Sequence, residues 1–371
     1  MPIIETMHVA LKNLLRASAT VLLAGCASGA ASAPSVAPDH VDITWMSITN
    51  MYFELRPLGI IADGYISRIP KGNFFGPGGG LGQTHTPSRP DSAAVARVLG
   101  ALGGPSKVGV LLTGHSHFDH SFDTGVWSKL TGARVIGSRT TCFQAYAQDI
   151  PSERCTTVNG GEKIALADGV TMWVIRWNHS GDPAVNPEQH NPVELSSIPR
   201  LDPATGGLRA GVAEDFPNGG GNRAYLIVVD GPQGRFSWLF TNSASAVDLT
   251  VPIVVDGVNH GAPITNLEAA MKAADLRSVD LWIGSGGVAV SRMVVPVIKP
   301  VAFLPVHWDD FWLPFEAGVA KPYSDPSTEA FLSSSGVRVV RPTQYMDKWR
   351  LDRSGVRTID NSGIKSALGF H

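Results

Sequence analysis

Residues Leu111 to Thr124 read LLTGHSHFDHSFDT, and four possible metal ligands fall within six consecutive positions of this stretch. They are His115, His117, Asp119 and His120. Packing does not explain so dense a cluster, because each buried imidazole or carboxylate needs a partner or carries a desolvation cost of a few kcal/mol. The apolar run KVGVLL at 107–112 precedes the cluster and predicts a buried strand, so we expect the cluster at a strand end.

The spacing inside the cluster predicts two ligand groups. In an extended segment, residues two apart face the same side, so His115 and His117 are expected to reach one ion. Asp119 and His120 lie where the chain turns into the next helix, so they are expected to serve a second ion nearby. Imidazole and carboxylate groups are the ligands that catalytic zinc sites use.

Two further histidines follow predicted strands. His179 comes after VTMWVIRW at 170–177, and His307 comes after VAFLPV at 301–306. Strand-end loops that gather at one edge of packed sheets would bring these histidines to the cluster. The surrounding pattern alternates strands and helices, which favours an α/β or α+β domain. Further strands are expected at 43–48, 51–55, 58–63, 133–137, 163–167, 223–229, 236–241 and 279–284, and helices at 91–102, 122–131, 139–147 and 267–276.

This order of motifs resembles the metallo-β-lactamase superfamily, whose HxHxDH signature is matched in full by HSHFDH at 115–120. The resemblance covers roughly Asp42 to Asp310. ITWMSITNMYFELRPLGIIAD, NRAYLIVVDG and KPVAFLPVHWDDF look like the branch that contains ascorbate-phosphate lactonases and N-acyl phosphatidylethanolamine phospholipase D. The resemblance implies a four-layer αββα sandwich for the domain at 41–371. It also implies one ion on His115, His117 and His179 and another on Asp119, His120 and His307.

One position departs from the family pattern. The family usually carries an aspartate that bridges the two metals, whereas the aligned stretch FTNSASA has Asn242 and Ser243, with Ser243 at the carboxylate's place. A hydroxyl is a poorer ligand for a hard cation than a carboxylate is. The second ion is therefore expected to be weak, absent or different in kind, unless a nearby group such as Asp248 substitutes.

The predicted activity is that of a metal-dependent hydrolase with one or two zinc ions or another divalent metal. A bound water becomes a nucleophile near neutral pH, and the metal polarises the ester, lactone or phosphodiester bond under attack. Asp119 is expected to be both a ligand and the acceptor of that water's proton. The alternative is a metal-binding member of the fold whose catalysis is lost or altered because Ser243 replaces the bridging aspartate.

Other possible site residues carry weaker arguments. His260 and Tyr65 are candidates for the proton donor to the leaving group, although surface or packing roles are favoured for both. Four aromatic residues beside the ligand motifs either wall an apolar pocket or belong to the core: Trp177, Trp308, Phe311 and Trp312. The Gly-rich stretch at 73–82 is either a surface loop or a cleft wall, and the irregular segment at 182–221 is either functional or disordered.

The N-terminus has the layout of an export signal over residues 1–26. Lys12 and Arg16 precede an apolar run that is too short to span a bilayer, which takes about 20 residues. The run ends in LAGC, which resembles a bacterial lipobox and implies that a lipid on Cys26 anchors the exported protein to a membrane facing the periplasm. A plain signal peptide or a fortuitous apolar N-terminus is the alternative. Residues 27–40 read as a tether.

Composition limits the partners. The chain has 371 residues, of which 43% are hydrophobic, as in globular proteins, and 30 basic against 32 acidic residues give a net charge of -2. This balance predicts no nucleic-acid partner, so a small-molecule or lipid-like substrate is expected. The oligomeric state is left open. Cys142 and Cys155 form either a disulfide or two unrelated buried thiols, and neither is expected to bind zinc.

Overall fold

The computed structural model describes residues 37–71 and 86–370, which belong to one compact unit. The predicted leader at 1–26 with its Cys26, most of the tether, and the Gly-rich stretch lie outside the described residues. The first strand begins at His40, one residue before the predicted start of the domain.

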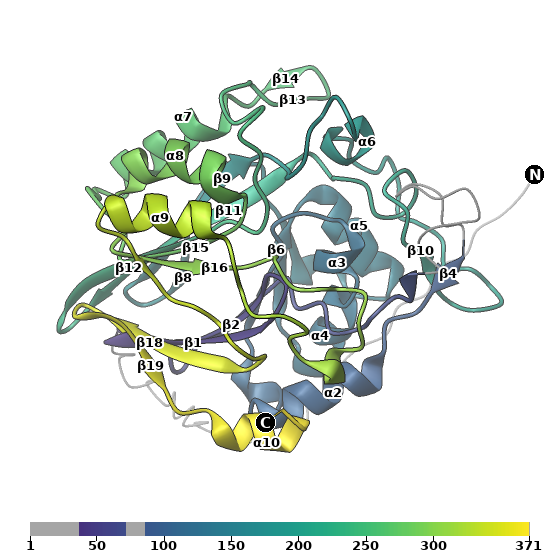
Figure 1. Ribbon diagram of the computed structural model, residues 1–371. Helices are drawn as coiled ribbons and strands as arrows, with labels where there is room; N and C mark the ends of the chain where they lie inside the picture. The colour runs from purple at the N-terminus through teal and green to yellow at the C-terminus, as the bar shows by residue number, and fades with distance from the viewer. Residues whose placement is uncertain (1–36, 72–85, 371) are drawn as a thin grey trace, which may run out of the picture. The chain divides into compact units, whose positions relative to one another are not determined.

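Two mixed β-sheets form the centre of this unit (Figure 1). The first sheet has the order β19-β18-β1-β2-β3-β5-β6-β7 and the second has the order β17-β16-β15-β12-β11-β9-β8. The strands of the first sheet are β1 (His40–Ser47), β2 (Asn50–Glu54), β3 (Gly59–Ala62), β5 (Val110–Leu112), β6 (Arg134–Gly137), β7 (Cys155–Thr157), β18 (Asp347–Asp352) and β19 (Gly355–Ile359). Those of the second are β8 (Lys163–Ala167), β9 (Val170–Trp177), β11 (Asn222–Gly231), β12 (Gly234–Phe240), β15 (Leu281–Gly284), β16 (Ala302–Pro305) and β17 (Arg338–Val339). Two ribbons pair β4 (Pro87–Ser88) with β10 (Leu208–Arg209) and β13 (Val254–Val255) with β14 (Val258–Asn259).

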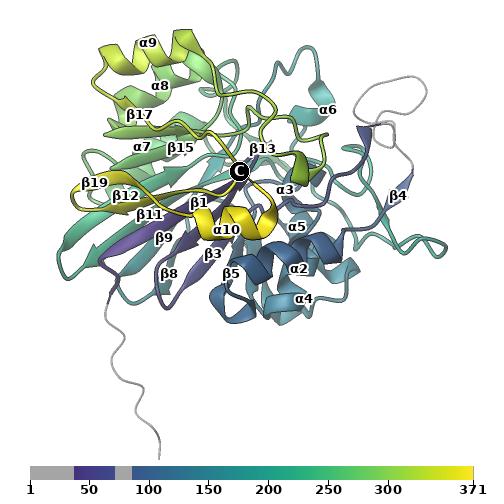
Figure 2. The same ribbon diagram turned by 60° about the horizontal axis from the view of Figure 1, so that its bottom comes forward.

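Helices cover the outer faces of the two sheets. Figure 2 shows α2, α4 and α5 beside the first sheet and α7, α8 and α9 beside the second. The helices are α2 (Ser92–Ala101), α3 (Phe118–Ser121), α4 (Thr124–Thr131), α5 (Arg139–Ala147), α6 (Pro187–His190), α7 (Pro263–Ala273), α8 (Gly287–Ile298), α9 (Pro326–Ser334) and α10 (Ser362–Leu368). Single 3-10 turns are η1 (Pro105–Lys107), η2 (Ser152–Arg154) and η3 (Phe315–Ala317).

Alternation along β9 shows why this sheet is buried on both faces. Met172 and Val174 belong to the hydrophobic cluster between the sheets, while Trp173 and Ile175 belong to the cluster under α7 and α8. Successive side chains of a strand point to opposite faces, so a strand between two apolar layers needs hydrophobic residues at every position. The predicted four-layer αββα sandwich is confirmed.

Local signals placed most elements within a few residues of their observed bounds. The predicted helix at 91–102 is α2, and Asp91 caps it by accepting hydrogen bonds from the backbone N–H groups of Ala93 and Ala94. The strand predicted at 107–112 is shorter, because residues 105–107 form η1 and β5 begins at Val110. The irregular segment at 182–221 is confirmed as mostly loop, with only α6 and β10 in it.

Cys142 on α5 and Cys155 at the start of β7 form a disulfide, which settles the alternative left open by their spacing. Replacing both by alanine should lower the free energy of unfolding by about 2–4 kcal/mol, because the crosslink restricts the unfolded chain. Urea denaturation of the oxidised wild type and the double variant measures the difference. A reducing agent should then destabilise the wild type alone, and equal midpoints for the two proteins would contradict the prediction.

Candidate metal centre

The predicted ligands all follow strand ends of the two sheets. β5 ends at Leu112 and delivers HSHFDH, in which His117 precedes the short helix α3. His179 follows β9 and His307 follows β16. A hydrogen bond links the two sheets here: Tyr225 Oη on β11 donates to the carbonyl of Thr113, just after β5, at 2.8 Å. The ends of β5, β9 and β16 thus meet at one edge of the sandwich.

The first group contains His115, His117 and His179, whose ligand atoms all lie within 4.8 Å of one another. His115 Nε2 and His117 Nδ1 are 3.1 Å apart. His179 Nδ1 donates to the Ser180 carbonyl at 2.8 Å, which leaves Nε2 as the lone-pair nitrogen. All three side chains are buried, so few hydrogen-bond donors are available to the lone pairs of their ring nitrogens. A metal cation would satisfy these lone pairs.

The second group contains Asp119, His120 and His307, again with ligand atoms within 4.8 Å. Asp119 Oδ2 lies 3.3 Å from His120 Nε2 and 3.3 Å from His307 Nε2. The structure therefore brings all six predicted side chains together, in the two groups that the resemblance implies. Their role as ligands remains a proposal.

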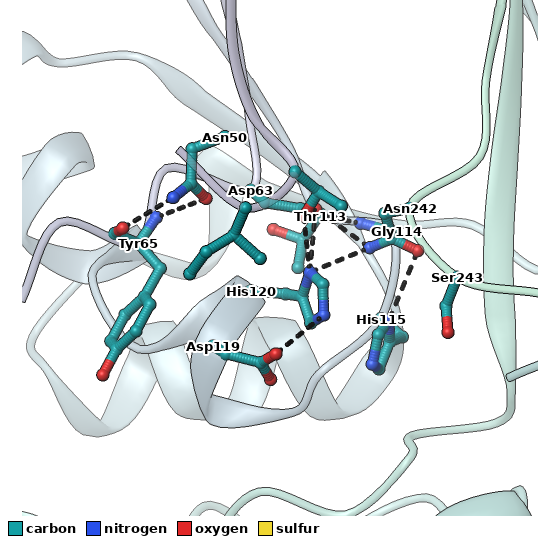
Figure 3. A network of polar contacts seen from close by, with 12 residues as sticks. Asn50, Asp63, Tyr65, Thr113, Gly114, His115, Asp119, His120, Asn242 and Ser243 are labelled. Atoms are coloured by element: carbon teal, nitrogen blue, oxygen red, sulfur yellow. Dashed lines mark hydrogen bonds and ion pairs between the residues drawn. The ribbon is translucent and has the colours of Figure 1, made fainter. Parts of the chain in front are cut away.

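Asp63, which follows β3, organises the centre and was missed by the sequence analysis (Figure 3). One carboxylate oxygen, Oδ2, accepts from Thr49 Oγ1 at 2.6 Å and from Asn242 Nδ2 at 2.9 Å, and lies 2.9 Å from His120 Nδ1. The other accepts from the Gly114 N–H at 2.8 Å. A carboxylate on Nδ1 fixes the tautomer of His120 and turns its Nε2 toward the second group. The sequence analysis placed Asp63 at the end of the strand predicted at 58–63 and gave it no role.

Asn242, rather than Ser243, lies against the ligands. Asn242 Oδ1 is 3.4 Å from His115 Nδ1, and its amide nitrogen is 3.2 Å from His120 Nδ1. Gly114 permits this approach, since a Cβ there would lie 2.1 Å from Asn242 Nδ2. Ser243 Oγ accepts from the Ser180 N–H at 2.7 Å.

Burial sets the protonation of the first group. Desolvation lowers the pKa of His117 to about 3 and lowers the pKa of His115 and of His179 well below its usual range. The neighbouring imidazoles His120 and His117 add to the depression at His115. Neutral imidazole is the form that binds metal, so these side chains are ready as ligands at neutral pH.

Carboxylates set the charge of the second group. Burial opposes the ionisation of Asp119, yet His120 and His307 hold its pKa well below the usual range. Burial also disfavours the charged form of His120, but Asp119 and Asp63 outweigh it and raise the His120 pKa to about 10. Two buried carboxylates thus require positive charge at this place, and a divalent cation provides it in the same position as a proton on His120. The residues fit a metal at both groups.

The structure separates the weaker candidates from the ligands. His260 lines a different cavity of about 210 Å³ with Arg176 and Asn266. The ring of Tyr65 packs edge-on against Phe118, and its hydroxyl accepts from the Ile69 N–H at 2.8 Å. Burial raises the pKa of Tyr65, which opposes proton release. Neither residue belongs to a ligand group.

Two of the four aromatic candidates belong to the core and two lie near the ligands. Trp177 is fully buried, and Trp308 stacks on Trp45 with ring centroids 5.4 Å apart. Phe311 packs edge-on to His307 at 5.9 Å, and Trp312 stacks on Phe118 of the hexapeptide. Asp248 lies in neither group, because its carboxylate accepts from Asn178 Nδ2 at 2.6 Å.

Comparisons with known proteins find partial and distant similarities. No known family model matches the chain. Over 72 residues, 19% of the chain, it is 32% identical to a UPF0173 metal-dependent hydrolase of Pyrobaculum islandicum. The chain spans about a third of the length of the curated relatives it matches, 32% of each.

Solved structures resemble the chain only distantly. Igni18, a metallo hydrolase from Ignicoccus hospitalis, is 12% identical with a TM-score of 0.48, over 84% of this chain and 99% of that one. CmlA, a diiron β-hydroxylase from Streptomyces venezuelae, is 14% identical with a TM-score of 0.44, over 89% and 55% of the two chains. The layers and the strand-end hexapeptide described above decide the fold. The chain has a metallo-β-lactamase-like fold. No helix within residues 37–71 and 86–370 combines the length and the apolar character needed to cross a membrane.

Proposed function

We propose that this chain is a metal-dependent hydrolase of an ester, lactone or phosphodiester bond. The observation that carries the proposal is the pair of ligand groups meeting at the strand ends, each with three side chains, of which all but His307 are buried. The curated relatives, which are named metal-dependent hydrolases, support it. Zinc is the metal we propose, because five imidazoles and a carboxylate match its preferred ligands.

In this proposal His115, His117 and His179 hold one ion, and Asp119, His120 and His307 hold a second. When bound, such ions acidify a coordinated water and polarise the carbonyl or phosphoryl group under attack. Asp119, which His120 and His307 keep ionised, accepts the proton of the attacking water. Asp63 holds His120 in the ligand tautomer throughout.

We also propose that the protein is exported and tethered through a lipidated Cys26 to a bacterial membrane on its periplasmic side. The order of charge, apolar run and cysteine in residues 1–26 supports this. The disulfide between Cys142 and Cys155 supports it independently, because such bonds persist in oxidising compartments. The substrate is then a small or lipid-like molecule, with no nucleic-acid partner.

Metal removal tests the activity directly. Purified protein should contain one or two zinc ions by elemental analysis and should hydrolyse at least one of para-nitrophenyl acetate, a simple lactone and bis-para-nitrophenyl phosphate. Dialysis against a chelator should abolish turnover, and added zinc should restore it, because the ions activate the water that attacks the substrate. Protein that retains its zinc yet turns over nothing on this panel would overturn the proposal.

That negative outcome would favour the second candidate, a metal-binding member of the fold without turnover. Its support is the pair Asn242 and Ser243, which places no carboxylate between the groups: the Ser243 hydroxyl is engaged by Ser180. Elemental analysis distinguishes one bound ion from two. A single ion would indicate that the second ion is missing because Asn242 and Ser243 provide no bridging carboxylate.

A further inference from the structure

A second feature adjoins the metal centre. A cavity of about 180 Å³, here named the His190 cavity, is lined by His179 and His190, by Asn218, and by Asp248. It lies between the irregular segment that carries α6 and the segment around β13, both labelled in Figure 1. The rings of His179 and His190 meet edge to face with centroids 5.5 Å apart, so the cavity begins beside a proposed ligand.

Two buried polar atoms of the lining have no hydrogen-bond partner: His190 Nε2 and Asn218 Oδ1. The His190 side chain is only 5% exposed and Asn218 only 2% exposed, so solvent reaches neither freely. Leaving such atoms unpaired is costly, and native proteins pair nearly all of them. The metal-ligand arrangement makes no use of either atom.

The bonds around the Asn218 amide make its oxygen an acceptor. Asn218 Nδ2 donates to the Gln189 carbonyl at 3.1 Å, which fixes the amide with its oxygen as the open group. His190 Nδ1 lies 3.4 Å from Asp248 Oδ2, and a carboxylate accepts, so Nδ1 carries a proton toward Asp248.

The cavity is therefore suited to a hydrogen-bond donor. Asn218, with its open carbonyl oxygen, and Asp248, with its carboxylate, line one small space, and no lysine or arginine is among its described lining residues. Pro192, Pro252 and Ile253 supply apolar walls for a short carbon chain. We propose that the His190 cavity is a substrate subsite for an amino or hydroxyl group on a short apolar chain. This rests on the proposed hydrolase function.

A matched substrate series tests the subsite. Esters of one alcohol are prepared with acyl chains that end in an amino, a hydroxyl or a methyl group, in a short and a longer series. We expect kcat/KM for a donor-terminated ester to exceed that of its methyl-terminated partner by about tenfold, the usual effect of one hydrogen bond to a buried acceptor. A higher rate for the amino ester than for the hydroxyl ester would identify the ammonium as the preferred group.

Variants assign the preference to the cavity. Asn218→Leu has nearly the same shape and removes one acceptor, so the donor-to-methyl ratio should fall toward one. Asp248→Asn should lower the amino ester relative to the hydroxyl ester. Asn266→Leu, which alters a partly buried amide of the other cavity, should leave the ratio unchanged. Metal content and the unfolding midpoint of each variant are measured alongside, so that misfolding is recognised.

Three outcomes are distinguishable. A donor preference that Asn218→Leu abolishes supports the subsite. Equal turnover of all esters by the wild type overturns the subsite and leaves the hydrolase intact. If no ester is hydrolysed, the lactone and the phosphodiester decide the hydrolase proposal, and the cavity is tested by binding of propylamine or propanol, followed through the imidazole signals of His190 by NMR. Saturable binding that Asn218→Leu weakens supports the cavity, and no binding overturns it.

Discussion

Replacing His117 by alanine is expected to reduce hydrolysis by about a thousandfold or more and to lower the metal content of the purified protein. The ring lies 3.1 Å from His115 Nε2 inside the first group, so its loss leaves an ion with two protein ligands. A metal supplies several kcal/mol of barrier reduction, and each 1.36 kcal/mol corresponds to a factor of about ten. Steady-state turnover and elemental analysis on the same sample measure both effects.

The control for this substitution is His260→Ala. His260 is a histidine of the same fold that lines the separate cavity beside Arg176, so its loss should leave turnover and metal content near those of the wild type. Full metal content and full turnover in His117→Ala would contradict the assignment of the first group. Loss of activity with the unfolding midpoint unchanged would exclude a purely structural explanation.

The sequence was sufficient to predict that the six proposed ligands gather at one place, because their positions follow strand ends. An apolar strand followed by a polar side chain places that side chain at a sheet edge, and this applied to His115, His179 and His307 alike. The long-range pairing of the first sheet was not predictable in the same way. β18 pairs antiparallel with β1, as in His40 with Asp352, and no local pattern encodes a partner so distant in the chain.

The residues around the ligands were harder to predict, because their roles depend on what lies opposite. Asp63 was only the last residue of the strand predicted at 58–63 until the structure placed His120 against it. His190 lay in an irregular segment without periodicity, and only the fold brings Asp248 to its Nδ1. Sequence alignment placed Ser243 at the bridging position, whereas packing against Gly114 brings the Asn242 amide to the ligands.

Asp63 is expected to have the second large effect. Asp63→Ala leaves the Gly114 N–H, the Asn242 amide and the Thr49 hydroxyl without their acceptor, and it removes the partner of His120. Breaking such a buried charged network costs about 3–5 kcal/mol of unfolding free energy. Loss of the group that orients a metal-binding imidazole lowers metal affinity by about 10–100-fold. Urea denaturation and zinc titration against a competing chelator measure the two effects.

A graded series separates the carboxylate's charge from its hydrogen bonds. Thr49→Val removes a single donor to Asp63 Oδ2 and should cost only about 1 kcal/mol. Asp63→Asn keeps the shape but brings an amide N–H against the Asn242 amide, which lies 2.9 Å from Oδ2. Combining it with Asn242→Asp restores one donor facing one acceptor, so the double variant should regain part of the stability that Asp63→Asn loses.

The double variant, Asp63→Asn with Asn242→Asp, also moves the negative charge toward the first group, since Asn242 Oδ1 lies 3.4 Å from His115 Nδ1. Zinc affinity should therefore recover less completely than stability, because His120 no longer has a carboxylate on its Nδ1. If the double variant binds zinc as tightly as the wild type, then Asp63 acts through total charge and not by orienting His120. If Asp63→Ala is as stable as Thr49→Val, the four contacts of Asp63 do not form the network described above.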